Sequence, residues 1–229
     1  MIHILSLETS TSVCSVALHQ NGVLVSIKEI DVIGAHAERI MGLIDEVMSE
    51  SRLSKNNLSA IAVSSGPGSY TGLRIGVSTA KGLAFGLNIP LIGVNTLKAL
   101  SLSAIEQMTE KGVSIPLIDA RRTEVYCQVF SEENEPLSDI HSEVLSENSF
   151  ENYLRKGPVY FCGDGVAKTK TIILHPMAVY LSSQISANQI GKLAYLKFEN
   201  EDFEDLAYFV PNYLKEFKVL HSKKNPFKR

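Results

Sequence analysis

Residues 65–76 read SGPGSYTGLRIG and join an apolar run at 58–64 to a helical pattern at 71–86. A glycine-rich turn between a strand and a helix can cradle an anion, because its amides and the helix N-terminus offer unpaired donors. The same residues also fit a tight turn that only leads the chain into the helix. Both interpretations place a strand, a turn and a helix in succession, which indicates an α/β fold.

The segments around this turn agree with that fold class. Strand-like runs lie at 2–8, 13–19 and 23–30, and Asn21-Gly22 between the last two is a hairpin signal, so three antiparallel strands open the fold. Apolar residues recur at helical spacing at 35–49. After the strand at 58–64 and the helix at 71–86 we expect a strand at 90–94 and a helix at 96–109. This order predicts that the later strands are parallel.

The second half of the chain partly repeats the first. We expect strands at 113–118, 124–130, near 140–145 and at 158–162, and a helix at 187–198. The repetition predicts two related lobes, each with a mixed sheet and flanking helices: an N-terminal lobe at 1–110, and at 111–229 a smaller, degenerate C-terminal lobe followed by a basic tail. The tail at 215–229 has six basic residues and one acid, which is typical of a solvated terminus but could also contact a phosphate backbone.

Composition narrows the class of protein. The 229 residues are 45% hydrophobic and 21% charged, as in a globular protein with a packed core. The net charge of −3 argues against an independent nucleic-acid binder. No apolar stretch has the roughly 18 residues of a membrane helix, and the chain opens on a strand pattern, so we expect a cytoplasmic protein with no membrane partner. Cys14, Cys127 and Cys162 lie far apart without CxxC spacing, which predicts buried thiols.

Several motifs that carry chemistry are missing from the sequence. The six histidines include no pair at i, i+4, the spacing that holds a metal on one helix face. No GxxxxGK[ST] loop or GxSxG elbow occurs. We therefore predict no metal site and no catalytic residues.

Polar turns remain as candidates for a nucleotide site. Glu8, Thr9 and Ser10 follow the first strand, and such a turn could hold a phosphate or be an ordinary hairpin turn. The corresponding turn of the second half has Asp119 followed by two arginines, which could bind phosphate through their planar guanidinium groups or balance nearby acids. A third turn follows a buried strand and could admit a base or ribose. The predicted nucleotide-binding residues are Glu8, Thr9, Ser10, Asp119, Gly163, Asp164 and Gly165.

The helix at 71–86 carries small residues at regular spacing. Gly72, Gly76, Ala80 and Ala84 recur every four residues and form a ridge on which another segment can pack closely. Gly76 and Gly82 should each cost about 1 kcal/mol relative to alanine, so close backbone approach is the expected compensation. The sequence leaves open whether that approach is to the protein's own sheet or to a partner.

These features together resemble a known family. The order of elements is similar to the actin-like ATPase (ribonuclease H-like) fold, and Gly66 to Arg74 resembles the signature of the bacterial TsaB (YeaZ) family, with Tyr70 where Phe is usual. Further agreement in order and spacing comes from 7–11, 119–122 with Glu124 and Tyr126, 163–165 and 211–214.

The resemblance implies a non-catalytic subunit of the machinery that makes threonylcarbamoyladenosine in tRNA. Such a subunit binds and activates the catalytic paralogue TsaD, together with the ATPase TsaE, and reaches tRNA only through that complex. No cofactor is required, although ATP or ADP can lie at the partner interface. In isolation we expect a homodimer. The missing metal ligands agree with a non-catalytic role, and the family's older glycoprotease label finds no nucleophile and base here.

The resemblance also implies a partner interface on the first two helices. Its expected residues are His36, Ile40, Met41, Leu43, Ile44, Met48, Gly72, Leu73, Gly76, Thr79, Ala80 and Leu83. Glu8 stands where ATPases of this fold have Asp, which weighs against nucleotide turnover. The alternative is a small nucleotide-dependent kinase or ATPase that uses Glu8, Thr9, Asp119 and 163–165.

Overall fold

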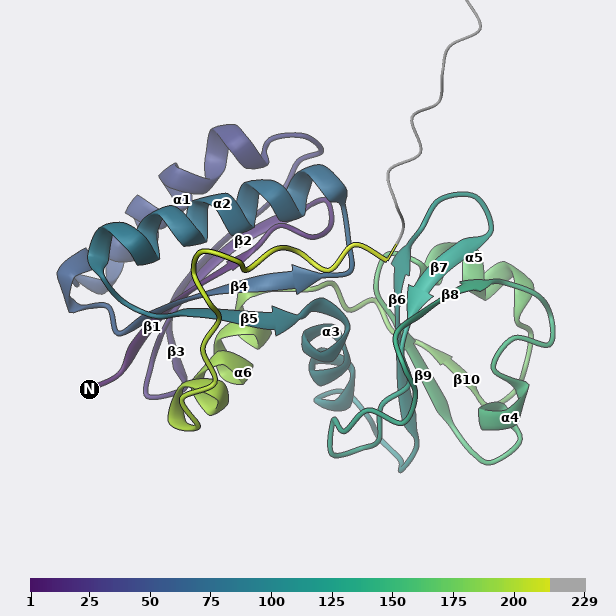
Figure 1. Cartoon of the computed structure of the whole chain (residues 1–229). Coiled ribbons are helices and arrows are strands. Elements are labelled where there is room, and N and C mark those ends of the chain that lie inside the picture. The colour runs from purple at the N-terminus through teal and green to yellow at the C-terminus, as the bar shows by residue number, and fades with distance from the viewer. Residues whose placement is uncertain (215–229) are drawn as a thin grey trace, which may run out of the picture.

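Figure 1 shows a computed structural model of the chain, in which two sheets lie side by side with helices around them. The structure describes residues 1–214, so the basic tail expected at 215–229 lies outside the described residues. Each sheet has five strands.

The first sheet contains the three antiparallel strands predicted at the N-terminus. Its order is β3-β2-β1-β4-β5; β2 is antiparallel to β1 and β3, whereas β4 is parallel to β1 and β5 is parallel to β4. Asn21 and Gly22 form the hairpin turn with φ of 48° and 77°. The strands are β1 (His3–Glu8), β2 (Val13–Gln20), β3 (Val23–Asp31), β4 (Ala60–Gly66) and β5 (Leu91–Asn95).

Helices cover both faces of the first sheet. Helices α1 (His36–Ser51) and α2 (Tyr70–Leu87) pack on one face, and a short 3-10 helix, η1 (Lys55–Asn57), follows α1. Helices α3 (Thr96–Ile105) and α6 (Ala187–Glu199) pack on the other face. Alternate residues of β1 face the two layers, because successive side chains of a strand point to opposite sides.

The second sheet repeats the strand order of the first. Its order is β10-β9-β6-β7-β8, in which β7 is antiparallel to β6 and β8, while β9 and β10 continue in parallel on the other side of β6. Read from the first strand of each half, the two arrangements are the same, which confirms the predicted fold class. The strands are β6 (Val113–Asp119), β7 (Glu124–Cys127), β8 (His141–Val144), β9 (Val159–Cys162) and β10 (Ala178–Tyr180).

Three elements of the second half were not predicted: α4 (Glu151–Leu154), α5 (Val166–Ile172) and β10. Helices α4 and α5 have four and seven residues, which is less than two helical turns, and β10 has only three residues, so none of them has a periodic pattern of the usual length. The strand expected at 124–130 ends at Cys127, and Phe130 forms isolated bridges with Ser114 and Pro136 instead.

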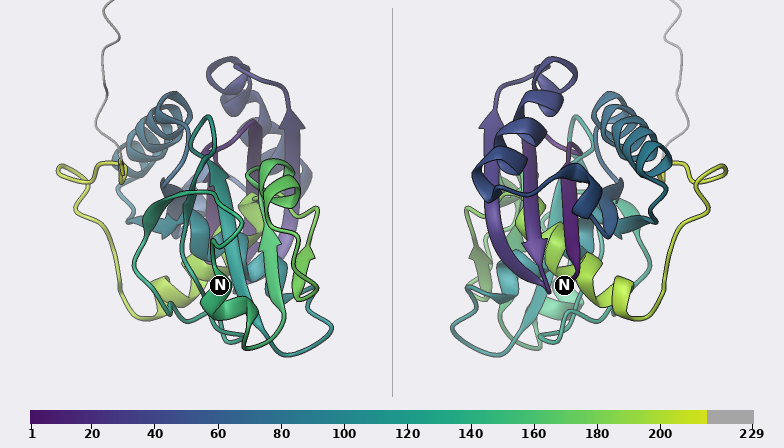
Figure 2. Two further views of the ribbon diagram at one scale, coloured as in Figure 1. Left: turned by 90° about the vertical axis from the view of Figure 1, so that its right-hand side faces the viewer. Right: turned by 90° about the vertical axis from the view of Figure 1, so that its left-hand side faces the viewer.

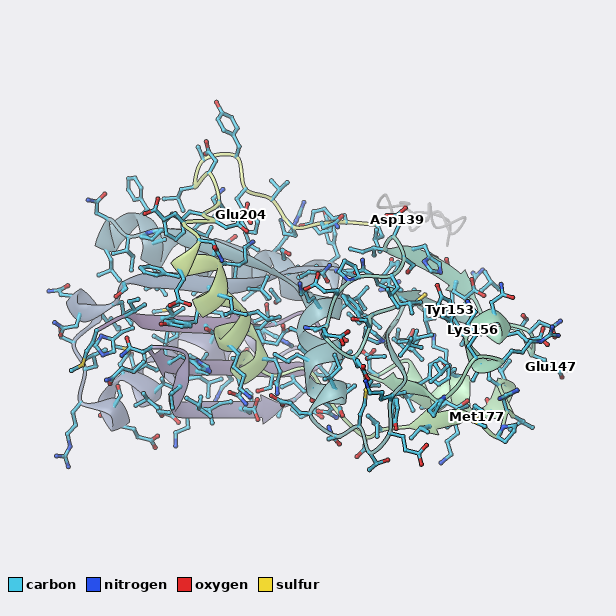
Figure 3. The ribbon with its side chains drawn as sticks, turned by 90° about the horizontal axis from the view of Figure 1, so that it is seen from below. Asp139, Glu147, Tyr153, Lys156, Met177 and Glu204 are labelled. Atoms are coloured by element: carbon cyan, nitrogen blue, oxygen red, sulfur yellow. The ribbon has the colours of Figure 1, made fainter. Side chains whose placement is uncertain are left out.

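The C-terminal part of the chain returns to the first lobe, which corrects the predicted lobe boundary. Helix α6, expected in the lobe at 111–229, contacts all five strands of the first sheet. Residues 203–214, the C-terminal strap, then run beside β5 and α2, with a bridge between Glu204 and Leu91 and a 2.7 Å hydrogen bond from Asn212 N to Ser65 O. Figure 2 shows the strap passing from the end of α6 to α2, and Figure 3 shows Glu204 beside α6.

Cys14, Cys127 and Cys162 are all buried and unbridged, as expected. Among the helices of residues 1–214, none combines the length and apolar character needed to cross a bilayer.

Candidate functional site

The signature turn leads from β4 into α2 and is enclosed by distant parts of the chain. The Gly66-Pro67 peptide is cis, and Ser69 caps α2 by accepting a 3.3 Å hydrogen bond from Gly72 N. Gly66 has φ of 102°, and a Cβ there would lie 2.7 Å from Asn212 O of the C-terminal strap. A side chain at this position is therefore excluded by both conformation and space.

The β1–β2 turn lies directly beneath the signature turn. Glu8, Thr9 and Ser10 are almost completely inaccessible, with exposed fractions of 0%, 0% and 1%. Ser69 N donates to Ser10 O at 2.7 Å, and Thr9 Oγ1 donates to the carbonyl oxygen of Gly72 at 2.8 Å. Ser10 N donates to Glu8 Oε1. The turn is therefore closed by the protein's own loop.

The small-residue ridge of α2 serves this closure. A Cβ on Gly68 would lie 2.5 Å from Ser10 O, and Cβ atoms on Gly72 and Gly76 would collide with Thr9. The ridge faces inward, since Ala80 and Ala84 are fully buried too. Of the two interpretations left open by the sequence, packing within the subunit is correct, and the ridge itself is no surface for a partner.

Burial also changes the chemistry of Glu8. Removal from water raises the pKa of its carboxyl to about 7, although the hydroxyls of Ser10 and Ser64 and the amides of the turn oppose that rise. Within residues 1–214, Glu8 Oε2 has no hydrogen-bond partner. The expectation that Glu8, Thr9 and Ser10 hold a phosphate is corrected, because all three belong to the interior.

The other predicted nucleotide-binding residues gather in the second lobe. Asp119 N donates to Asp164 Oδ1 at 2.7 Å. Gly163 has φ of 99° and faces Leu117 O so closely that a Cβ would collide with it, and a Cβ on Gly165 would lie 2.9 Å from Leu117 Cβ. These glycines therefore pack on β6. In the described part of the chain, no hydrogen bond joins this cluster to Glu8, Thr9 or Ser10.

The residues expected at the partner interface divide into two groups. Met41 is 45% exposed, and Thr79 and Leu83 are half-buried. The other nine are corrected to interior positions, because they face the first sheet or the β1–β2 turn: His36, Ile40, Leu43, Ile44, Met48, Gly72, Leu73, Gly76 and Ala80.

The exposed side of α1 and α2 contains glycines that the interior does not require. Gly42 of α1 and Gly82 and Gly86 of α2 are exposed, and a Cβ on any of them would meet no atom within 4 Å. Met41 and Phe85 lie on the same helices, and Phe85 is 79% exposed. We call these five residues the glycine face. The sequence signal was the set of helical glycines outside the four-residue ridge, of which only Gly82 was noted.

Groups that could hold a metal ion are also missing from the described chain. Over residues 1–214, no three His, Cys, Asp or Glu side chains come together in a way that could ligate a metal. His36, the sole histidine of α1, is buried.

Comparisons with known proteins give one consistent result. The family model described as TsaD, tRNA N6-adenosine threonylcarbamoyltransferase, matches residues 31–223. The TsaB protein of Haemophilus influenzae is 42% identical over 123 residues, which are 54% of this chain and 51% of that protein. The TsaB protein of Buchnera aphidicola subsp. Baizongia pistaciae is 31% identical over 82% of this chain and 90% of its own length. YeaZ from Pseudomonas aeruginosa superposes with a TM-score of 0.80 at 26% identity, covering 93% of this chain and all of that one.

The repeated strand order and the two related polar turns define a two-lobed protein of the actin-like (ribonuclease H-like) fold. The chain spans about half the length of the first curated relatives it matches, with 51% and 53% of those proteins aligned, but 90% of the Buchnera protein. It belongs to the TsaB (YeaZ) family, within the wider group that the TsaD model matches.

Proposed function

We propose that this protein is a cytoplasmic, non-catalytic subunit for threonylcarbamoyladenosine modification of tRNA. It binds and activates a TsaD-like catalytic paralogue and works together with a TsaE-like ATPase. The relatives named as tRNA threonylcarbamoyladenosine biosynthesis proteins support the reaction pathway. The glycine face supports the mode of action.

The observation that carries the proposal is the unexplained cost of the exposed glycines. Each helical glycine costs about 1 kcal/mol relative to alanine. Gly72 and Gly76 are required by the β1–β2 turn, whereas Gly42, Gly82 and Gly86 have open space around them. A partner helix that approaches the backbone closely supplies the missing reason, because small residues allow the shortest distances between helix axes.

The interior supports a subunit without its own reaction. Glu8 is the position at which an ATPase of this fold needs an accessible carboxylate, and here it is sealed beneath α2. We therefore propose that no cofactor is required by this chain, and that any ATP or ADP it contacts lies at the joint surface with the paralogue. The kinase or ATPase alternative has no comparable observation in its favour.

The interface is tested by co-purification of the tagged chain with its TsaD-like paralogue. Gly82→Leu places a branched side chain on the glycine face and also raises helix propensity, so the fold is retained. We expect a loss of affinity of about 5- to 150-fold, since overpacking a core costs about 1–3 kcal/mol and a closely packed interface resembles a core. Ala167→Leu on the exposed side of α5 is the matched control. Equal affinity of both variants would show that the glycine face is not the interface.

The activity is tested by reconstitution. Paralogue, ATPase, tRNA and the small-molecule substrates are combined with and without this chain, and the modified nucleoside is measured by mass spectrometry. We expect modification only when the chain is present. Modification at the same rate in its absence would contradict the proposed function.

A further inference from the structure

The turn between β6 and β7 holds two neighbouring arginines in an unfavourable backbone conformation. Arg121 and Arg122 have φ of 72° and 51°, in the left-handed region that favours Gly or Asn. Both residues are exposed. Neither arginine has the conformational freedom of the glycine that usually occupies such a position. The presence of two arginines here therefore points to a role for their side chains.

Lys168 of α5 fixes this turn from below. Its ammonium donates to Asp119 Oδ1 at 2.8 Å, to Arg122 O at 3.0 Å and to Glu124 O at 2.7 Å. Asp119 Oδ1 also accepts a 2.6 Å hydrogen bond from Arg121 N. The Lys168 side chain is only 19% exposed, so these hydrogen bonds belong to the packed part of the structure. The two arginines are therefore presented on a preorganised backbone.

Nearby acids are already engaged by other groups. Asp119 pairs with Lys168, and the Glu124 carboxylate accepts from Ser142. Asp164 Oδ1 accepts from Asp119 N. Over residues 1–214, the ion pairs include neither Arg121 nor Arg122. Among the described residues, no carboxylate is thus within ion-pair distance of either guanidinium group of this turn.

The shape of the turn selects the kind of anion. A free phosphate or nucleotide needs a concave site that surrounds it. Arg121 and Arg122 are instead exposed in the turn between β6 and β7, and neither lines the cavity beside α4 or the cavity beside α6. An extended polyanion can contact such a turn, because successive phosphates meet successive guanidinium groups.

We propose that Arg121 and Arg122 contact the phosphate backbone of tRNA in the assembled complex. The inference rests on the proposed function, which supplies the RNA. It also refines that function, because this subunit then contributes directly to RNA binding instead of acting only through its paralogue. The overall charge of −3 is compatible with it, since the contact is local.

The test measures tRNA binding by the assembled complex through fluorescence anisotropy over a series of salt concentrations. Arg121→Gln/Arg122→Gln removes both charges and keeps side chains of similar length. We expect Kd to rise by about tenfold at roughly 50 mM salt, and the slope of log K against log salt to become shallower by about 1.5, as for two lost phosphate contacts. Arg121→Lys/Arg122→Lys should retain most of the slope, because it retains both charges.

The matched control is Arg155→Gln/Lys156→Gln, a second pair of neighbouring basic residues. Arg155 pairs with Glu151, and Lys156 lies 6.0 Å from the centre of the Tyr153 ring, at the end of the second lobe that Figure 3 shows. This variant loses the same formal charge, so it reports any effect of net charge alone. We expect its affinity and salt slope to match those of the unmodified complex.

The possible results separate this inference from the proposed function. If the unmodified chain forms no complex with the paralogue, the proposed function fails and the RNA contact fails with it. If the complex forms and modifies tRNA, but the Arg121→Gln/Arg122→Gln variant binds tRNA with unchanged Kd and slope, only the RNA contact is overturned. Equal weakening by the control, or loss of binding of ATP or inorganic phosphate in place of tRNA, also overturns it.

Discussion

At the scale of single residues, Glu8 is a predicted nucleotide-binding residue that the structure places in the core. The carboxyl lies at the end of β1, and Thr9 and Ser10 beside it are hydrogen-bonded to the loop above. A charged carboxylate in that environment lacks water and lacks a cationic partner among the described residues, so the protonated form is favoured. The residue lies at the end of a strand, as polar residues of ligand-binding turns do, but its burial leaves it no access to solvent.

We predict a pH dependence of stability that comes from Glu8. Its pKa rises from 4.5 to about 7 on folding, so the folded state binds more protons than the unfolded state between these values. The free energy of unfolding attributable to Glu8 is therefore greatest below pH 4.5 and falls as pH rises through 7, by about 3 kcal/mol in total. Urea unfolding of the native protein and of Glu8→Gln from pH 5 to pH 8 measures this effect.

The quantity to compare is the difference between the two proteins at each pH. His19 is also buried, and desolvation lowers its pKa, so its contribution to stability is lost as pH falls. That contribution is common to both proteins and cancels in the difference. A difference that stays constant from pH 5 to pH 8 would contradict the assignment of the raised pKa to Glu8.

A second prediction concerns the glycines beneath which Thr9 lies. Gly72→Ala places a methyl group against the Thr9 carbonyl oxygen, which is backbone and cannot move without distorting the turn. We expect the free energy of unfolding to fall by about 1–3 kcal/mol, as for overpacking in a core. Thermal and urea unfolding check this; unchanged stability would mean that the turn relaxes freely around the new methyl group.

The polar turns could be predicted from sequence, but their accessibility could not. Glu8, Thr9 and Ser10 are recognisable because polar residues follow an apolar strand. Their burial depends on hydrogen bonds to Ser69 and Gly72, about sixty residues later in the chain, and on the strap residue Asn212 that encloses the same loop. Local patterns contain no information on such contacts, so a turn that is sealed and a turn that is open look alike.

At the scale of elements, α2 has two glycine-bearing sides with opposite roles. The side with Gly72 and Gly76 faces the β1–β2 turn, and the side with Gly82 and Gly86 faces outward. The four-residue spacing was correct as a prediction of close packing, but it selected the inward side. Small residues at four-residue spacing indicate that another segment packs closely on the helix. The sequence does not show whether that segment belongs to the same chain or to a partner; the fold does.

This difference leads to a third prediction. Gly82→Ala should raise the stability of the isolated protein by about 0.4–1 kcal/mol, because alanine restricts the unfolded chain and no atom opposes its methyl group. The same change should weaken association with the TsaD-like paralogue by about tenfold, because the added methyl group separates the helices. Unfolding experiments and calorimetric titration measure the two effects on one sample.

Gly72→Ala is the matched variant for comparison with Gly82→Ala. Both variants change a glycine of α2 to alanine, and only the surroundings differ. If Gly82→Ala stabilises the protein but leaves the affinity for the paralogue unchanged, the exposed glycines serve some purpose other than that interface.

Elements with a clear hydrophobic periodicity were predicted from sequence, whereas the short helices α4 and α5 and the short strand β10 were not. The strands of the first sheet and helices α1, α2 and α6 have clear periodicity and were found within a few residues. Helix α5 and strand β10 have seven and three residues, and they are held by contacts that sequence does not show, such as the hydrogen bonds of Lys168 to the β6–β7 turn.

At the scale of the whole molecule, the two lobes share a strand order but not a helix count. The first sheet is covered on both faces, and one of its covers, α6, comes from the C-terminal half of the chain. The strap then adds contacts along α2, where Lys81 Nζ donates to the carbonyl oxygens of Ala207 and Phe209 at 3.2 and 3.0 Å. The repeated strand order could be predicted from sequence. The packing of α6 on the first sheet could not, because local sequence patterns do not indicate which sheet a helix contacts.

The fold leaves the residues of the glycine face exposed on α1 and α2, which leads to a fourth prediction about assembly. Without a paralogue, we expect this face to pair with the same face of a second copy, since a twofold dimer brings the same patch of both subunits together and small residues allow close approach. Light scattering over a range of concentrations should therefore show a monomer–dimer equilibrium. Gly82→Leu should shift it to monomer, while Ala167→Leu should not.

Addition of the paralogue decides whether one face serves both purposes. If the homodimer and the heterodimer use the glycine face, the two assemblies exclude each other, and stoichiometric paralogue should convert the homodimer completely to heterodimer. A homodimer that persists in Gly82→Leu, or that binds paralogue without dissociating, would place self-association on a different surface. If both assemblies do use the glycine face, the apparent affinity of the native protein for its paralogue should fall as its own concentration rises, because self-association competes for the surface that the paralogue needs.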